Sequence, residues 1–355
     1  MIDKSIISRI NDAICDEKSK NIFRDRLIYS ITSDKYYLEK MISNTFERIK
    51  NDDRLSVFSK ELDLIKEDVW LFGAGRYAGY FVYFFPLMHW EGVIDSYLEG
   101  VSEFRGLPLI NFNTFMSDYA GQKILITSKP NYFDMLDQLH KAGITDDNII
   151  DGSFLWDVIE GGQYFDLECL PHAKTEGFVD VGCLDGLSTV AFRKWSGNEN
   201  DKYFCFEPDA NSREKCLKNF DRFNISNYEM YDKGAYNEST NLYFDANGTG
   251  ESHFIESEDD KPGDALKVAV TKLDDMLRGQ NITFIKMDIE GSESNALRGA
   301  KEIISEQKPK LAICVYHKPS DIIEIPHFVL SIRPDYRLYF RHYGDNECET
   351  VMYAI

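Results

Sequence analysis

Phe178-Val-Asp-Val-Gly-Cys-Leu-Asp-Gly-Leu-Ser-Thr189 carries the strongest structural signal in this 355-residue chain. Its apolar start predicts a buried strand, its two glycines predict a turn, and the residues after the second glycine predict a helix. Backbone N–H groups at a helix start that follows a strand can bind an anionic ligand. The stretch therefore predicts a ligand-binding turn at the carboxyl end of a strand.

The glycine spacing and the downstream strands favour S-adenosylmethionine over a dinucleotide as the ligand. A dinucleotide turn has the pattern Gly-x-Gly-x-x-Gly, whereas three residues separate Gly182 from Gly186. Glu207 ends the next predicted strand, where a carboxylate can accept hydrogen bonds from two ribose hydroxyls, although it could also be an ordinary exposed acid. The last two predicted strands, 336–342 and 350–354, are joined by a short loop and have to pair as a hairpin. A parallel sheet that ends in such a hairpin is typical of methyltransferases.

The expected fold class is α/β, with a class I methyltransferase sheet that is Rossmann-like and ends in an antiparallel hairpin. We predict four segments along the chain: a helical prologue (1–67), a small Rossmann-type domain (68–152), a packed connector (153–176) and an S-adenosylmethionine-dependent methyltransferase domain (177–355). The prologue has apolar residues at helical spacing, including Ile10 and Ile14. Its apolar face is expected to be covered by the rest of the chain or by a second copy, which would make a homo-oligomer.

A second glycine turn, Gly73-Ala-Gly75-Arg-Tyr-Ala78, follows the predicted strand Val69–Phe72. This arrangement is typical of a dinucleotide turn, and Asp95 ends the next strand at the distance of a ribose-binding acid. The segment resembles the compact nucleotide-binding domain of some bacterial sugar-modifying enzymes. The alternative is structural, because glycines also allow a helix to pack closely on a strand.

The amino-acid composition of the chain indicates which classes of molecule it can bind. The chain has 60 acidic and 40 basic residues, a formal net charge of −20. Such a surface repels a phosphodiester backbone, so we expect no nucleic-acid partner. No apolar run approaches the roughly 20 residues of a membrane helix, and the first residues lack a signal-peptide core. We therefore expect a cytoplasmic protein without a membrane span, whose seven scattered cysteines are reduced thiols.

From about Gly177 onward the chain resembles the FkbM-type methyltransferase family. The matching segments are Phe178-Val-Asp-Val-Gly-Cys-Leu-Asp-Gly186, Phe206-Glu-Pro208, Lys233-Gly-Ala235, Leu273-Asp-Asp275, Lys286-Met-Asp-Ile-Glu-Gly291, and Cys314-Val-Tyr-His-Lys-Pro319 followed by Ile325-Pro326. The resemblance implies an S-adenosylmethionine-dependent O-methyltransferase whose relatives act on sugars of polysaccharides and on natural products. We expect the acceptor to be a hydroxyl of a sugar, glycan or polysaccharide precursor. The alternatives are a nucleotide-sugar oxidoreductase or epimerase that uses the Gly73 turn, and a catalytically silent binding or scaffold protein.

Three residues at predicted strand ends are candidates for catalysis. A sugar hydroxyl hardly ionises at neutral pH, so a base has to take its proton during methyl transfer. His317 is the first choice for that base because its ordinary pKa lies near neutrality, although it could be a structural histidine. Asp288 and Glu290 would hold the methyl end of the cofactor or orient the acceptor. The same three side chains could hold magnesium or manganese, but the spacing does not demand a metal and we favour none.

The remaining site residues are predicted by position. The residues expected to bind the cofactor are Asp180, Gly182, Cys183, Asp185, Gly186, Ser188, Thr189, Glu207 and Asp288. The residues expected to contact the acceptor are Ser252, His253, His317 and His342. Ser252 and His253 belong to a segment, 245–263, that is rich in glycine and acids and is either a lid or an idle surface loop. His342 is either a wall of the acceptor pocket or a surface residue.

Overall fold

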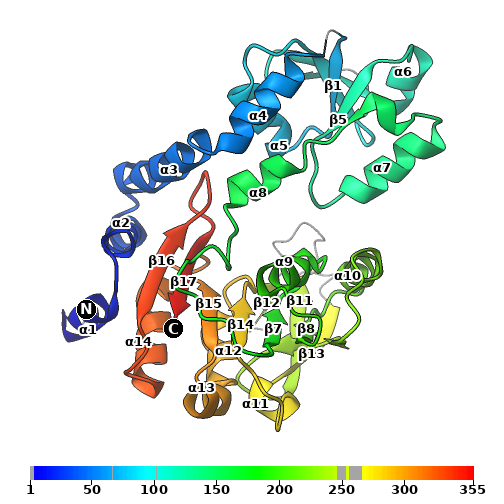
Figure 1. The fold of residues 1–355 in the computed structure, drawn as a ribbon. Coiled ribbons are helices and arrows are strands. Elements are labelled where there is room, and N and C mark those ends of the chain that lie inside the picture. Colours follow the sequence, from blue (N-terminus) through cyan, green and yellow to red (C-terminus); the bar gives the residue numbers. More distant parts are fainter. Residues whose placement is uncertain (1–3, 66, 101, 246–252, 256–265) are drawn as a thin grey trace. The chain divides into compact units, whose positions relative to one another are not determined.

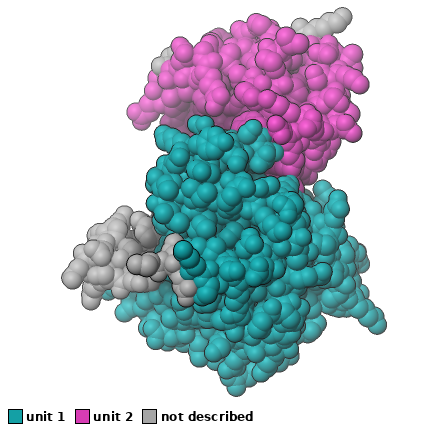
Figure 2. Space-filling view, turned by 90° about the vertical axis from the view of Figure 1, so that its left-hand side faces the viewer, with its two compact units in different colours: residues 1–45, 162–355 teal, residues 46–161 magenta. Residues whose placement is uncertain are grey.

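The computed structural model describes residues 4–65, 67–100, 102–245, 253–255 and 266–355. The chain forms two compact units, one of residues 1–45 with 162–355 and the other of residues 46–161 (Figure 2). The predicted helical prologue is therefore not a unit of its own, because its first 45 residues belong with the C-terminal part. None of the described helices has the length and apolarity needed to cross a membrane.

A seven-stranded sheet forms the centre of the larger unit (Figure 1). Its strands, in sheet order, are β16 (Leu338–His342), β17 (Thr350–Ala354), β15 (Lys310–Cys314), β14 (Phe284–Met287), β7 (Gly177–Val181), β8 (Lys202–Phe206) and β9 (Tyr228–Tyr231). The pairs from β15 to β9 are parallel, and β17 is antiparallel to both β15 and β16. The predicted fold class and the terminal hairpin are confirmed.

Helices cover both faces of this sheet, which explains why its central strands are continuous apolar runs. These helices are α9 (Leu187–Ser196), α10 (Ala210–Arg222), α11 (Leu273–Met276), α12 (Glu293–Arg298), α13 (Lys301–Gln307) and α14 (Asp321–Ile332). Successive strand residues alternate between two apolar cores: Val179 and Ile285 lie in one, whereas Phe178 and Phe284 lie in the other. The sheet is thus buried on both sides, and only its edges and strand ends can carry a site.

The N-terminal helices are α1 (Lys4–Ala13), α2 (Glu17–Thr32), α3 (Lys35–Lys50) and α4 (Asp53–Leu62). Ile10 of α1 and Phe23 of α2 are buried in the same core as strand residue Val179. Arg26 of α2 donates hydrogen bonds to the carbonyl oxygens of Tyr316, at 2.9 Å, and of Glu347. The apolar faces of the first two helices are therefore covered within the chain itself.

A small separate sheet joins β10 (Gly234–Ala235), β13 (Leu266–Thr271), β11 (Thr240–Asp245) and β12 (His253–Ile255) in that order. The sequence correctly predicts strands near 242–244 and 267–270, but these strands do not belong to the main sheet. The connection from β10 to β11 consists only of the residues between Ala235 and Thr240. This connection is too short for the crossover that would place β11 parallel to β10 in one sheet.

The smaller unit has a six-stranded sheet of Rossmann type. Its strands, in sheet order, are β3 (Ser102–Phe104), β4 (Leu107–Asn111), β2 (Trp90–Asp95), β1 (Val69–Phe72), β5 (Lys123–Ile126) and β6 (Ile149–Ile150). Its helices are α5 (Arg76–Phe84), α6 (Phe112–Ser117), α7 (Tyr132–Lys141), the 3₁₀ helix η1 (Asp146–Asn148) and α8 (Phe154–Glu160). The helix α8 lies in a segment for which the sequence shows no period.

The Gly73 turn packs closely within this unit. Gly73 has φ +110°, and an added Cβ would lie 3.3 Å from the side chains of Met135 and Thr127. The Thr127 hydroxyl donates to the Gly73 carbonyl at 2.6 Å. These contacts give the turn a structural role between β1 and β5. Binding of a nucleotide at this turn stays a prediction.

Lys310 and Glu176 form a buried ion pair that offers a test of the fold. Their side chains are 8% and 1% exposed, and Nζ lies 2.8 Å from Oε1. Replacing Lys310 by methionine leaves the Glu176 carboxylate buried without its cation, so we expect Lys310→Met to lower the free energy of unfolding by about 3–5 kcal/mol in urea denaturation.

The matched control is Lys308→Met, because the partner of Lys308, Asp335, is 54% exposed. We expect this variant to change the free energy of unfolding by less than about 1 kcal/mol. The double variant Lys310→Met/Glu176→Gln should recover most of the lost stability. If Lys310→Met lowered the free energy of unfolding no more than Lys308→Met does, the buried Glu176 carboxylate would not have the cost that we assign to it.

Candidate functional site

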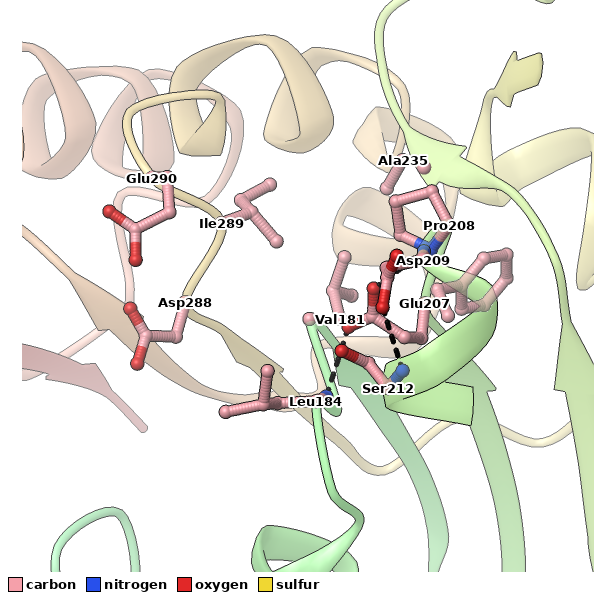
Figure 3. Close-up of a pocket in the computed structure, with 13 residues that line it drawn as sticks. Val181, Leu184, Glu207, Pro208, Asp209, Ser212, Ala235, Asp288, Ile289 and Glu290 are labelled. Atoms are coloured by element: carbon pink, nitrogen blue, oxygen red, sulfur yellow. Dashed lines mark hydrogen bonds between the residues drawn. The ribbon is translucent and has the colours of Figure 1, made fainter. Parts of the chain in front are cut away.

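A pocket opens at the carboxyl ends of β7, β8 and β14 (Figure 3). The turn after β7 contributes Gly182 and Leu184, and β8 is followed by Glu207. The segment after β14 contributes Asp288 and Glu290. Figure 3 shows Glu207 at one end of the pocket and the two carboxylates after β14 at the other. Three strands that lie side by side thus place their following residues around one cavity, as expected for an open parallel sheet.

The backbone of the turn is fixed by close packing. Gly182 has φ +75°, and a Cβ added to it would clash with the carbonyl oxygen of Asp288. Gly186 has φ +78° and starts α9, and its added Cβ would meet Sγ of Cys216 at 2.6 Å. Both glycines are therefore required by conformation and by space.

The buried lysine Lys286 stabilises the turn after β7. Lys286 of β14 pairs with Asp180 of β7 at 3.1 Å, and its Nζ donates to the Gly182 carbonyl at 2.7 Å. Burial alone would lower the pKa of Lys286, but the carboxylates of Asp180 and Asp288 outweigh it and raise that pKa. The hydroxyls of Ser188 and Thr189 donate to the other oxygen of Asp180, at 2.5 and 2.8 Å. Through this ion pair and these hydrogen bonds, Asp180 fixes the turn and the start of α9 against the central strands of the sheet.

Glu207 lines the pocket although it is only 6% exposed. It accepts hydrogen bonds from the backbone N–H groups of Leu184, at 3.0 Å, and Asp209, at 2.9 Å. Burial raises the pKa of Glu207 to about 7, against the lowering effect of these two hydrogen bonds. The carboxylate is thus held in one orientation and retains lone pairs for a ligand.

Acidic residues surround His317 at the other end of the pocket. Its Nε2 lies 3.5 Å from Asp288 and 3.3 Å from Glu290, and its Nδ1 lies 2.9 Å from Glu293. The phenol groups of Tyr164 and Tyr316 donate to the two oxygens of Asp288 at 2.8 and 3.2 Å. The structure therefore brings together the three predicted catalytic residues.

The charge of His317 does not suit the predicted role of general base. Burial alone would lower its pKa, but Glu290, Glu293 and Asp288 outweigh burial and raise the pKa of His317 to about 11. An imidazole with this pKa carries a proton at neutral pH and cannot accept another. The same positive charge and that of Lys286 lower the pKa of Asp288, against the effect of burial.

The structure separates the predicted cofactor residues into two groups. Gly182, Glu207 and Asp288 line the pocket. Asp180, Cys183, Asp185, Gly186, Ser188 and Thr189 lie outside its lining. The side chain of Thr189 is fully buried against Asp180, and that of Cys183, 1% exposed, lies 4.0 Å from Cys216. Both side chains therefore face the core, and a part for Cys183 and Thr189 in cofactor binding stays a prediction.

The predicted acceptor contacts are only partly described. Ser252 lies outside the described residues, and His253 begins β12 with a side chain that is also outside them. The lid hypothesis for 245–263 stays a prediction. His342 is 7% exposed in β16, with Nδ1 2.9 Å from the Thr350 hydroxyl, and it lies outside the pocket lining. His342 is thus not an exposed surface residue, because it is packed inside the hairpin, and its place in the wall of an acceptor pocket stays a prediction.

Sequence reasoning gave no role to three residues that shape this site: Lys286, Glu293 and Tyr164. Lys286 begins the family-like segment 286–291. A lysine inside an apolar strand indicates that its ammonium group pairs with a buried acidic or polar partner. Glu293 and Tyr164 show no such signal, because their approach to His317 and Asp288 depends on the folded chain.

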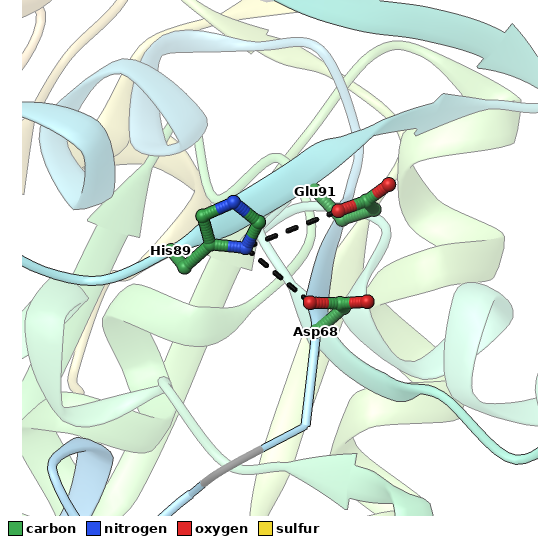
Figure 4. Close-up of side chains that lie close together, drawn as sticks. All are labelled: Asp68, His89 and Glu91. Carbon is green, nitrogen blue, oxygen red and sulfur yellow. Dashed lines mark ion pairs between the residues drawn. The ribbon is translucent and has the colours of Figure 1, made fainter.

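The smaller unit holds a second cluster of potential metal ligands, Asp68, His89 and Glu91 (Figure 4). His89 Nδ1 lies 3.3 Å from Asp68 and 3.9 Å from Glu91. The three side chains are 57%, 77% and 42% exposed, so water can solvate each of them. Such a surface cluster indicates no site by itself.

Comparisons with known proteins find methyltransferases that are similar to the C-terminal part. Residues 180–346 match the family model described as the methyltransferase FkbM domain. The 2-O-methyltransferase NoeI of Sinorhizobium fredii is 24% identical, with 37% of this chain and 59% of that protein covered. The chain thus spans less than two thirds of this curated relative.

Two solved structures are among those similar to this chain. The methyltransferase FkbM of Methylobacillus flagellatus is 19% identical with a TM-score of 0.46, and 88% of this chain and 99% of that chain are covered. The Aeropyrum pernix fibrillarin in complex with S-adenosyl-L-methionine is 9% identical with a TM-score of 0.34, and 54% of this chain and 71% of that chain are covered.

The tight turn after β7 predicts a specific effect of one methyl group. Gly182 and Gly197 both have positive φ, +75° and +66°, but only at Gly182 would a Cβ meet backbone, since nothing lies within 4 Å of it at Gly197. We expect Gly182→Ala to lower the free energy of unfolding by about 1–3 kcal/mol more than Gly197→Ala does. We also expect Gly182→Ala alone to weaken binding of S-adenosylmethionine at least tenfold, measured by calorimetry. If the two substitutions lowered the free energy of unfolding equally, the loss would come from the positive φ of each glycine and not from the lack of space for a Cβ at Gly182.

Proposed function

Since residues 180–346 carry a methyltransferase FkbM domain, we propose that the protein is an S-adenosylmethionine-dependent O-methyltransferase. The observation that carries the proposal is the pocket itself, with Glu207 at one end and Asp288 and Glu290 at the other, around the Gly182 turn. Bound there, S-adenosylmethionine supplies an electrophilic methyl group on a sulfonium sulfur.

The residues of the pocket fit this cofactor. Glu207 presents a buried, oriented carboxylate, which can accept hydrogen bonds from both ribose hydroxyls. Pro208 and Ala235 supply apolar surface beside it for the adenine. Asp288 lines the opposite end, where negative charge stabilises the positive sulfonium and amino groups. The absence of a side chain at Gly182 lets the cofactor approach the backbone.

The acceptor hydroxyl is placed beside Asp288 and Glu290. As methyl transfer forms the O–CH₃ bond and the methyl–sulfur bonding pair goes to sulfur, the hydroxyl proton has to leave. Asp288 and Glu290 are the carboxylates of the pocket lining that can draw it away. Tyr164 and Tyr316 hold Asp288 through both its oxygens, which limits its movement during the step.

A sugar is the acceptor class that we propose. The relative NoeI is named a 2-O-methyltransferase, and a sugar hydroxyl is a substrate for which activation at the acidic end of the pocket matters most. The proposed acceptor is a sugar, a nucleotide sugar or a glycan precursor of polysaccharide biosynthesis.

This function can be tested with the full chain and a panel of sugars, nucleotide sugars and oligosaccharides. We expect S-adenosylhomocysteine to form together with one acceptor that gains the mass of a CH₂ group, detected by mass spectrometry. We expect Asp288→Asn to lower kcat by about 100-fold or more, because it removes a carboxylate from the reacting centre. Binding of S-adenosylmethionine without turnover on any sugar would overturn the acceptor class, and absence of binding would overturn the cofactor.

The raised pKa of Glu207 predicts opposite effects on binding and stability. The folded protein holds the Glu207 proton up to pH about 7, against an ordinary value of 4.5, so stability is lost as pH rises between these values. At pH 8 we expect Glu207→Gln to raise the free energy of unfolding by up to about 3 kcal/mol and to weaken S-adenosylmethionine binding at least tenfold. At pH 4 the gain in stability should vanish.

Glu229→Gln is the control for this measurement. Glu229 pairs with Lys202 at 2.7 Å, and hydrogen bonds from Lys202 and Tyr231 lower its pKa, so its loss should not stabilise the protein at pH 8. A Glu207→Gln variant that is no more stable than wild type at pH 8 would show that burial of this carboxylate carries no cost.

A further inference from the structure

We propose that Asp288, Glu290 and His317 bind a divalent cation of the manganese or magnesium type, and that Glu293 orients the His317 ring for it. Sequence alone favours no metal here. The case for one comes from the spacing of the side chains, from buried polar atoms that lack hydrogen bonds, and from the excess of negative charge.

His317 lies close to both carboxylates of the proposed set, and Asp288, Glu293 and His317 each offer a ligand atom within 4.8 Å of the other two. His317 Nε2 lies 3.3 Å from Glu290 Oε2 and 3.5 Å from Asp288 Oδ1. Ligand atoms that share one cation at bond lengths of about 2.0–2.2 Å lie about 3 Å apart. The carboxylates of Asp288 and Glu290 lie at the same end of the pocket in Figure 3, away from Glu207. Small side-chain movements would complete the set, and Glu290, 29% exposed, has room to make them.

Glu293 occupies the position of an orienting carboxylate. It is fully buried and lies 2.9 Å from Nδ1 of His317, on the opposite side of the ring from Asp288 and Glu290. The backbone N–H of Ile289 donates to the same oxygen of Glu293 at 2.9 Å, which fixes the carboxylate. Metal-binding histidines almost always direct their second nitrogen to such a partner, which leaves Nε2 with a lone pair for the metal.

Unsatisfied polar atoms gather at this point. Across the described ranges of the chain, neither Nε2 of His317 nor Oε2 of Glu293 makes a hydrogen bond of ordinary geometry. The His317 side chain is 8% exposed and that of Glu293 is 0% exposed. Buried polar atoms are nearly always satisfied, and a bound ion is one of the few reasons for exceptions.

The charges around His317 favour a cation. Three carboxylates surround the ring, and a fourth acid, Asp321, is buried nearby. Lys286 is the buried cation on the sheet side, but it already pairs with Asp180 at 3.1 Å. Negative charges that lie close together in a partly buried site repel one another unless a cation neutralises them. A divalent cation on Nε2 and the two pocket carboxylates would do so in place of a proton on the ring.

The catalytic consequence rests on the proposed function. A hydroxyl bound to the cation has a lowered pKa, and its proton passes to solvent water. The oxygen lone pair then forms the bond to the methyl carbon, and the methyl–sulfur bonding pair stays on sulfur. With the cation bound, Asp288 and Glu290 act as its ligands instead of drawing the proton away themselves, and no neutral histidine is needed as a base.

The test is a titration of the EDTA-treated full chain with Mn²⁺, in which electron paramagnetic resonance measures the free ion. We expect one Mn²⁺ per chain, displaced by excess Mg²⁺. His317→Ala and Glu290→Gln should each weaken Mn²⁺ binding at least tenfold, and Glu293→Gln by about 10–100-fold. Thermal unfolding of each variant checks that it is folded, and the partly exposed Glu290 makes Glu290→Gln the safest of them.

His89→Ala is the matched control, because it removes a histidine from the exposed Asp68, His89 and Glu91 cluster. Mn²⁺ binding should be unchanged in this variant. The proposal is overturned if wild type binds no Mn²⁺ at millimolar concentration, if folded His317→Ala or Glu290→Gln binds it normally, or if His89→Ala abolishes binding. Calorimetry of S-adenosylmethionine on the same sample separates the two ideas. Cofactor binding without Mn²⁺ refutes the metal alone, and Mn²⁺ binding without cofactor refutes the proposed function alone.

Discussion

The buried ammonium group of Lys286 is the interaction on which the whole site depends. It joins strand β14 to the turn after β7 through Asp180 and the Gly182 carbonyl, and its charge lowers the pKa of Asp288. A charge without water is tolerated only when it is fully paired. The lysine therefore fixes the distance between the turn and the acidic end of the pocket, since moving either would leave a charge without a partner.

The acidic end is held from several directions. Tyr164 reaches Asp288 from a segment that precedes β7, and Glu293 reaches His317 from the first turn of α12. Arg26 of α2 binds the carbonyl oxygen of Tyr316, one residue before His317. Helix α2 thus supports the backbone next to His317, although the two segments are far apart in sequence.

Local patterns allowed much of the fold to be predicted. The strand, glycine turn and helix at 178–189 and the terminal hairpin depend on residues that are close in sequence, and Glu207 is found by counting from the strand before it. The orientations of Thr189 and Cys183 could not be predicted, because they depend on the path of the turn. The partners of Lys286 and Glu293 could not be predicted either, since strand order and helix packing bring them together. The separate sheet of β10 to β13 could not be predicted, because the apolar pattern of a strand does not specify which other strand it pairs with.

The burial of cysteines near the pocket has a consequence for chemical selectivity. Thiolates are strong nucleophiles, and a bound sulfonium would alkylate one within reach. Cys314 ends β15 next to Asp288 and Tyr164, and burial raises the pKa of its thiol, and that of Cys205, well above the ordinary value. Both sulfur atoms therefore keep their protons at neutral pH. The same dense packing that builds the sheet thus keeps these two thiols in their protonated, weakly nucleophilic form.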